Sequence, residues 1–280
     1  MEKKNVNTVK IYFIDPIEII SVVISTLIEL EFESFTLESD QAEKLLKIIT
    51  DNIRNVIFFC IRSKHDVETW LEYIEKIKSI KETHILMGAF GYDNMDEKTK
   101  NKFLEKNVSV INFKEIKKDP VNVLKKILFI FEAKGRRAHI RVNTIGENIA
   151  YFYMRGKDEP ITGKIVEISV SAFACKLDLL YKEYFDKGSL INEVVLVLRG
   201  MRIKSTVKVI GFSQESPDLF IFKFCQTKFT NDQMSVLPKC SPQNSRKIHE
   251  YIQKCLRIEL QEKLKSMDDA EKNKKDAQAE

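Results

Sequence analysis

The chain has 280 residues, enough for two domains that each bury a core, and 44% of its residues are hydrophobic while 31% are charged. With 9 glycines and 6 prolines, this composition excludes a disordered or collagen-like chain. The formal net charge of +5 does not by itself predict nucleic-acid binding, because such domains usually have a pI above about 9 and a basic stripe.

Cysteine usage and the N-terminal sequence predict the compartment. The 5 cysteines are widely spaced and form no CxxC pair, so we expect free thiols in a reducing compartment. No apolar core of signal-peptide length precedes Asp15, and the apolar run Ile17–Leu30 contains Glu18 and Glu29. That run is shorter than the ~20 residues that span a bilayer. We therefore expect a cytoplasmic protein without a membrane span.

The first half of the sequence alternates between strands and helices. Apolar runs predict strands at Val9–Ile14, Ser34–Glu38, Val56–Ile61, Ile85–Phe90 and Val108–Asn112. The segments that follow them predict helices at Ile17–Leu30, Gln41–Thr50, Asp66–Ser79, Asp96–Glu105 and Asp119–Glu132. Such alternation with short loops predicts an α/β domain over residues 1–134, with a parallel sheet covered on both faces.

This order of five strand–helix units resembles the receiver domain of response regulators. Receiver chemistry needs carboxylates at the carboxyl ends of the first and third strands, to hold Mg²⁺ and accept a phosphoryl group. Here the first strand delivers only Asp15, and the third delivers Cys60, whose thiol cannot replace the acceptor carboxylate. Lys114 follows the fifth strand, either as a counterpart of the receiver lysine or as a solvated loop residue. We expect a receiver-like interaction or spacer domain without phosphotransfer.

The second half has the pattern of an all-β domain followed by a helix. Short alternating segments predict six strands, at Ile149–Met154, Ile161–Ser169, Ala172–Leu177, Glu193–Leu198, Ile203–Ile210 and Phe220–Cys225. Six strands at near-regular spacing favour a small closed antiparallel barrel. An amphipathic helix is predicted at Ser245–Leu264, which gives a barrel domain over residues 135–266. Residues 267–280 have no apolar stripe, so we expect a disordered charged tail.

A cluster of arginines marks the junction between the two halves. Gly135 is followed by Arg136, Arg137 and Arg141, the last two in RxxxR spacing. The guanidinium group suits anion binding because its rigid fork matches phosphate oxygens bidentately and its flat face stacks on rings. The segment therefore predicts an anion site at the junction between two domains.

Together with a second motif, this cluster resembles the PilZ family, whose members bind the bacterial second messenger cyclic di-GMP. The second motif is ExSxxA, formed by Glu167, Ser169 and Ala172, and the resemblance covers residues 135–260. It implies that the arginines wrap the ligand and read guanine edges and phosphates, while the acid and the serine contact the guanine. It also implies motility or surface behaviour as the output, through an unidentified protein effector.

The second motif departs from the family pattern [D/N]xSxxG at both ends. Glu167 is one methylene longer than Asp, and Ala172 replaces the Gly. If the Gly position requires a positive φ, alanine costs on the order of 1 kcal/mol. If it serves a close approach of the ligand, the methyl group interferes instead. Both departures weaken binding, and both alternatives stay open at this point.

No catalytic or metal-binding pattern accompanies these motifs. The sequence contains no GxSxG, HExxH, P-loop or dinucleotide fingerprint. We therefore predict a non-enzymatic cyclic di-GMP receptor without a cofactor or metal, in which ligand changes the orientation of the receiver-like domain, and we expect no DNA binding. The alternatives are an adaptor that no longer binds ligand, a phosphorelay member, and single-stranded nucleic-acid binding through Tyr151, Tyr153 and Arg155.

Overall fold

The computed structural model describes residues 9–49, 54–80, 85–93, 95–134, 137–230 and 233–279. The chain forms two compact units. The first comprises Met1–Ala138 and Leu256–Glu280, and the second comprises His139–Cys255. The predicted helix after the barrel therefore contributes to both units, since its first part is in the second unit and its remainder is in the first.

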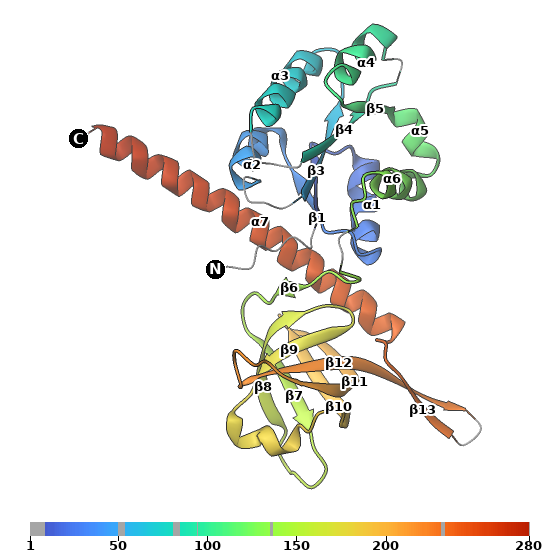
Figure 1. Ribbon diagram of the computed structural model, residues 1–280, viewed down its shortest axis with the longest axis vertical. Helices are drawn as coiled ribbons and strands as arrows, with labels where there is room; N and C mark the ends of the chain where they lie inside the picture. Colours follow the sequence, from blue (N-terminus) through green and yellow to red (C-terminus); the bar gives the residue numbers. More distant parts are fainter. Residues whose placement is uncertain are drawn as a thin grey trace. The chain divides into compact units, whose positions relative to one another are not determined.

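The first unit is built on a five-stranded parallel sheet in the order β2-β1-β3-β4-β5 (Figure 1). The strands are β1 (Val9–Ile14), β2 (Ser34–Leu37), β3 (Arg54–Ile61), β4 (Ile85–Gly91) and β5 (Ser109–Asn112). The helices are α1 (Glu18–Glu29), α2 (Ala42–Ile48), α3 (Asp66–Lys78), α4 (Glu97–Leu104), α5 (Phe113–Lys118) and α6 (Pro120–Ile130), with a 3₁₀ turn η1 (Ser39–Gln41) before α2. This doubly wound order confirms the predicted receiver-like fold.

Aromatic side chains of β3 hold both helical layers to the sheet. Successive residues of a strand point to opposite faces, so Phe58 and Phe59 serve different layers. The ring of Phe58 stacks between the rings of Phe13 and Phe90, with centroids 5.3 and 5.2 Å away. The ring of Phe59 stacks on Trp70 of α3 at 4.9 Å. The sheet is therefore buried on both faces, as its continuous apolar strands predict.

One helix of this unit was not predicted. The six-residue α5 lies between β5 and α6, and it buries Phe113 and Ile116 beneath otherwise charged residues. Six residues are less than two turns, so their periodicity carries almost no signal. The segment after β5, where a loop was one expectation, therefore forms a short helix that packs at the edge of the sheet.

The second unit is a closed six-stranded antiparallel barrel, as predicted. Its strands follow the order β11-β10-β7-β8-β9-β12, and pairing of β11 with β12 closes the sheet. They are β7 (Asn148–Tyr153), β8 (Ile161–Ile168), β9 (Ala172–Lys176), β10 (Leu190–Leu198), β11 (Met201–Phe212) and β12 (Leu219–Thr230). Two short strands were not predicted, β6 (Val142–Asn143), which pairs with β8, and β13 (Gln233–Leu237), which pairs with β12. A 3₁₀ helix, η2 (Leu179–Tyr184), follows β9.

A cluster of phenylalanines fills the barrel. The ring of Phe222 lies 4.7 Å from that of Phe152 and 5.1 Å from that of Phe173. Phe185 closes one side, with its ring edge-on to Phe152 at 5.1 Å. These side chains are at most 4% exposed. Since such rings dominate core energetics, they make the barrel a self-sufficient core.

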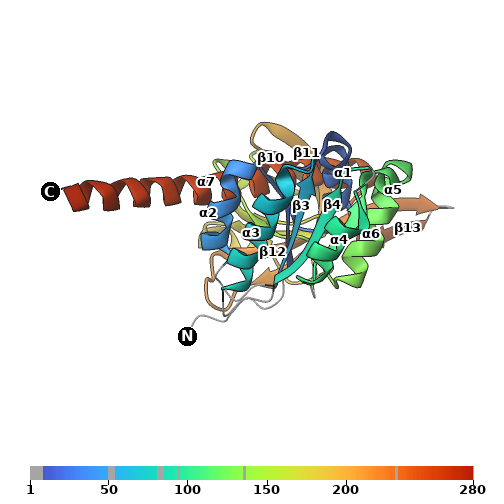
Figure 2. The same ribbon diagram turned by 90° about the horizontal axis from the view of Figure 1, so that it is seen from above.

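The last helix is longer than predicted. α7 spans Pro242–Ala279 as one continuous helix, which Figure 2 shows from above. Within the second unit it buries Ile248, Tyr251 and Ile252. Helical structure through Ala279 replaces the disordered tail expected over residues 267–280. The reason is intrinsic propensity, because the Ala, Glu, Lys and Gln residues that lack an apolar stripe are also the strongest helix formers.

Candidate functional site

The candidate site is organised by the short strand β6. Val142 and Asn143 pair with Ile168 and Glu167 at the end of β8. The chain continues along β8, since the backbone N–H of Thr144 donates to the carbonyl oxygen of Val166 at 2.9 Å. Val142 and Ile168 face the barrel interior, where they are 4% and 0% exposed. Alternation along the strands then directs Arg141, Asn143 and Glu167 outward.

Arg141 and Glu167 meet on this outer face. Arg141 Nη1 donates to Glu167 Oε1 at 3.3 Å, and the two side chains are 51% and 41% exposed. The strand register is irregular between Ile165 and Glu167, where one extra residue on β8 opposes β9. Such a bulge re-aims the side chains beside it. The structure thus brings together one residue from each of the two predicted motifs.

This pair is well suited to guanine. A guanidinium donates to the O6 and N7 acceptors of guanine, and a carboxylate accepts from its N1 and N2 donors. An exposed ion pair contributes only about 0–1 kcal/mol, so a ligand can replace the contact between the two side chains at little cost. The outer face of β6 and β8 therefore presents a donor and an acceptor of the kinds that guanine can pair with.

Ser169 has a different environment from the one expected for a ligand contact. Its side chain is buried, and its hydroxyl accepts from the N–H of Ala172 at 3.1 Å and donates to the carbonyl oxygen of Ala172 at 3.0 Å. The backbone N–H of Ser169 also donates to that carbonyl oxygen at 2.8 Å. Ser169 thus closes the tight connection from β8 to β9. Its predicted contact with the ligand stays a prediction.

The backbone at Ala172 settles one of the two alternatives raised by the missing glycine. Ala172 is the first residue of β9, and it is not among the residues with a positive φ. Alanine is therefore unstrained at this position. Ala172 therefore differs from the family's glycine only by its methyl group. The residue is half-buried and lies in the β8–β9 connection that Ser169 closes.

Of the other two arginines of the motif, the structure describes only one. Arg136, like Gly135, lies outside the described residues. Arg137 is described and exposed, and it belongs to the first unit, whereas Arg141 belongs to the second. In the chain the two are four residues apart. The structure therefore assembles Arg141, Glu167, Ser169 and Ala172 within one unit.

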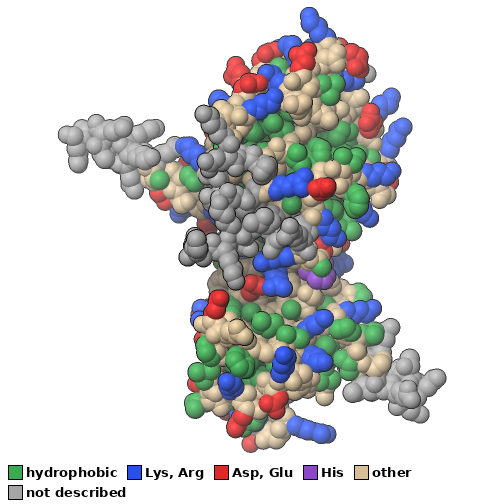
Figure 3. All heavy atoms as spheres, in the orientation of Figure 1, with side chains coloured by type: hydrophobic (Ala, Val, Ile, Leu, Met, Phe, Trp, Pro, Cys, Tyr) green, Lys and Arg blue, Asp and Glu red, His purple; other side chains and the backbone are tan. Residues whose placement is uncertain are grey.

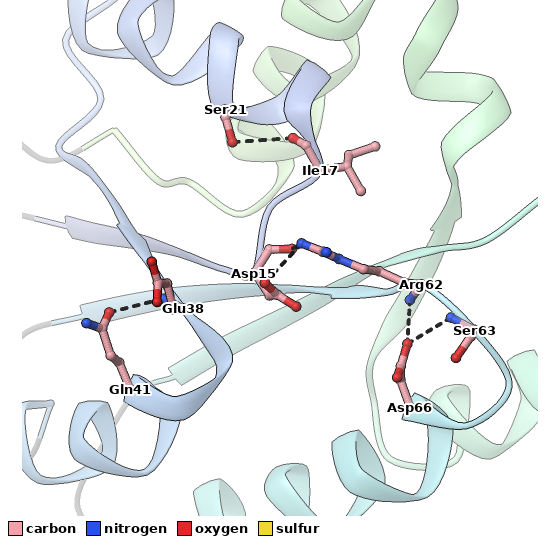
Figure 4. Close-up of polar contacts among 8 residues, drawn as sticks. All are labelled: Asp15, Ile17, Ser21, Glu38, Gln41, Arg62, Ser63 and Asp66. Carbon is pink, nitrogen blue, oxygen red and sulfur yellow. Dashed lines mark hydrogen bonds and ion pairs between the residues drawn. The ribbon is translucent and has the colours of Figure 1, made fainter.

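The carboxyl edge of the sheet in the first unit carries an arginine that sequence reasoning missed. Arg62 follows β3 directly, and its Nη2 donates to Asp15 Oδ1 at 2.9 Å and to the Asp15 carbonyl oxygen at 3.2 Å (Figure 4). Asp66 holds this turn by accepting from the backbone N–H groups of Arg62 and Ser63 at 2.9 and 2.8 Å. The signal that could have identified Arg62 in the sequence is its position immediately after a buried strand.

This ion pair occupies one of the carboxylates that receiver chemistry needs. Asp15 is already neutralised by Arg62, and Cys60 is buried within β3. Burial raises the pKa of the Cys60 thiol to about 12, so the thiol stays protonated. Lys114 is exposed on α5. Over the described residues, no group of three or more His, Cys, Asp or Glu side chains could hold a metal ion.

Among the described residues on the face of the second unit that Figure 3 shows, lysine and arginine side chains form no continuous basic groove. In Figure 3, lysine and arginine side chains are scattered over the visible face of the second unit, between hydrophobic and acidic ones. Binding along a nucleic-acid backbone needs a continuous basic groove with interleaved aromatic rings.

Within the described helices, none is long and apolar enough to cross a membrane.

Comparison with known proteins adds the following. Scans against family models and against curated proteins find no match. Among solved structures, the chain is similar to the PilZ domain of Escherichia coli YcgR with c-di-GMP, with a TM-score of 0.34 and 13% identity over 46% of this chain and 96% of that one. A longer YcgR structure in complex with c-di-GMP gives a TM-score of 0.33 and 13% identity over 49% of this chain and 50% of that one.

A third similar structure is the complex of K. pneumonia MrkH with c-di-GMP, with a TM-score of 0.32 and 15% identity over 42% of this chain and 51% of that one. The match therefore spans about half the length of the longer YcgR and MrkH structures. PilZ domains are among the structures that this chain is similar to. The barrel fold itself is defined by the strand order and register of this chain.

Proposed function

We propose that the barrel unit binds cyclic di-GMP and that the protein is a non-enzymatic receptor for this second messenger. The observation that carries the proposal is the pairing of Arg141 with Glu167 on the outer face of β6 and β8. This pair offers the donors and acceptors that distinguish guanine from other bases. Arg137, and Arg136 before it, would add contacts to phosphate.

Ser169 has a supporting role in this proposal. Its hydroxyl fixes the connection between β8 and β9, two residues beyond Glu167. A carboxylate must be held in position to read two donors of one base, because a misplacement of about 1 Å is costly. We infer that Ser169 acts mainly by positioning Glu167, with any direct contact to the ligand secondary.

Calorimetric titration with cyclic di-GMP tests the proposal. We expect heat of binding from the unaltered protein and its loss in the double variant Arg137→Ala, Arg141→Ala. The matched control is Arg202→Ala, which removes an exposed arginine on β11. If the unaltered protein gives no heat, the chain is better described as an adaptor that no longer binds the ligand.

The substitution at the glycine position gives a second test. Ala172 is unstrained, so Ala172→Gly relieves no backbone strain. If the methyl group limits the approach of the ligand, Ala172→Gly will strengthen binding. An unchanged dissociation constant means that the family's glycine is not needed here. In either case the variant separates a steric effect from a conformational one.

We further propose that binding changes the orientation of the receiver-like unit, because Arg137 and Arg141 lie in the segment that joins the two units. A ligand that engages both arginines favours one arrangement of this segment over others. Small-angle scattering with and without cyclic di-GMP measures the change. An unaltered scattering profile at saturating ligand contradicts it. The output that the resemblance implies is motility or surface behaviour, through a protein effector.

A further inference from the structure

A second feature of the barrel surface is a groove of about 450 Å³ on its outer face, over β7, β8 and β9. Its volume is within the range of small-molecule sites, about 300–1,000 Å³. Its polar lining includes Glu147, Tyr151, Thr162, Lys164 and Lys176. Neither sequence motif contains any of these residues. The groove therefore needs an explanation of its own.

Two lysines lie side by side on neighbouring strands of this groove. Lys164 on β8 is directly opposite Lys176 on β9, with both side chains on the outer surface. Like charges in this position destabilise a sheet, by up to about 1 kcal/mol. Lys176 is partly compensated by Asp218, at 3.6 Å. A bound anion would remove the remaining repulsion, so the groove favours a phosphate.

The other side chains favour a base beside that phosphate. Glu147 lines the groove with a carboxylate, which can accept from the N1 and N2 donors of guanine. Tyr151 is half-buried and supplies an aromatic ring, and Thr162, opposite it on β8, supplies a hydroxyl. A carboxylate would repel a bare phosphate but fits a guanine nucleotide, which carries both an anion and a donor edge.

The groove and the Arg141–Glu167 pair lie along the same strand. Lys164 and Glu167 are three residues apart on β8, roughly 10 Å at the usual strand rise. Cyclic di-GMP contains two guanines and two phosphates, whereas the Arg141–Glu167 pair accounts for one guanine. The groove supplies a second acid and two cations, the groups that the other half of the ligand requires.

We propose that this groove is a second subsite for the cyclic dinucleotide, with Glu147 and Tyr151 receiving the second guanine and Lys164 and Lys176 receiving the adjacent phosphate. The proposal rests on the proposed function, since it assigns the other half of the same ligand. It also gives the ligand a defined direction, along the outer face of β8.

Calorimetric titration with cyclic di-GMP tests the subsite in the full chain. The double variant Lys164→Ala, Lys176→Ala should bind about tenfold more weakly or worse, the loss expected when charge-assisted contacts are removed. The deficit should shrink at high salt, where the contribution of exposed charges is screened. Glu147→Gln, which keeps the size of the side chain, should weaken binding by a similar factor.

The chain supplies a control of equal charge in Arg202→Ala, Lys204→Ala. Both side chains are exposed on β11, and neither lines the groove. This double variant should bind cyclic di-GMP like the unaltered protein. Circular dichroism of each variant verifies that the barrel is folded.

The outcomes are distinct. If the groove variants bind like the unaltered protein while Arg141→Ala abolishes binding, the subsite is wrong and the proposed function stands. If the groove and control pairs weaken binding equally, the effect is one of net charge and the subsite is again wrong. If the unaltered protein shows no binding, the proposed function and the subsite fail together.

Discussion

Asn148 is the residue on which we expect the barrel to depend most. It is the first residue of β7 and is 1% exposed. Its Nδ2 donates to the carbonyl oxygens of Ile145 and Gly146, both at 3.1 Å. Its Oδ1 accepts from the backbone N–H of Arg199 at 3.2 Å and from the hydroxyl of Tyr251 at 3.0 Å. One amide thus joins β7, the β10–β11 turn and α7.

The structure allows the cost of losing this amide to be worked out. Asn148→Ala removes four hydrogen bonds and leaves the hydroxyl of Tyr251, which is 0% exposed, without that acceptor. At about 1 kcal/mol for each bond, the free energy of unfolding of the barrel should fall by about 3–4 kcal/mol. This exceeds the usual effect of a single substitution. Asn143→Ala, at an exposed position on β6, should change it by less than about 0.5 kcal/mol.

Urea unfolding can assign the effect to one unit. The chain has 1 tryptophan, Trp70, which is on α3 in the first unit. Its fluorescence therefore follows the first unit, while far-ultraviolet circular dichroism follows both. With a slope of about 1–3 kcal/mol per molar urea, Asn148→Ala should lower the midpoint of the barrel transition by about 1–4 M. A shift no larger than that of Asn143→Ala would refute the reasoning.

Three further predictions concern single side chains. In Gly163→Ala the new Cβ would lie 2.5 Å from both Cys175 Sγ and Leu177 Cδ2, so the barrel should lose about 1–3 kcal/mol, and an unchanged midpoint in circular dichroism contradicts this. Because burial raises the pKa of Cys60 to about 12, little thiolate is present near pH 8. Iodoacetamide should therefore modify Cys60 only after unfolding. Rapid modification of Cys60 in the folded protein, located by mass spectrometry, argues against this. Acetyl phosphate with Mg²⁺ should leave the first unit unlabelled, since Asp15 is paired with an arginine, and a stable phosphoryl label contradicts that reading.

Local periodicity was enough to locate most of the elements. The largely apolar run Val9–Ile14 has the same bounds as β1, and the three- and four-residue steps of Asp66–Ser79 correspond to α3. The elements that were missed, such as α5 and β6, are short. A two-residue strand has no period to detect, and it exists only because β8 offers it a partner. Tertiary pairing decides such segments.

For the candidate site, too, some features could be predicted from the sequence and others depend on the fold. The two motifs could be recognised from residue types and spacing, which placed Arg141 and Glu167 on the candidate list. Their contact depends on β6 pairing with the end of β8, and on the bulge that turns Glu167 outward. The use of the Ser169 hydroxyl in the β8–β9 connection is likewise invisible in the sequence, because its partners are backbone atoms.

The sequence by itself determined the order of elements, the two fold classes and the residue types available for binding, because apolar periodicity and motif spacing are local properties of the chain. Only the tertiary structure decided which residues became neighbours across strands. The Arg141–Glu167 pair and the Lys164–Lys176 pair both depend on strand register and bulges. A register is fixed by burial summed over the whole barrel, and a shift of one residue would turn every one of these side chains to the other face.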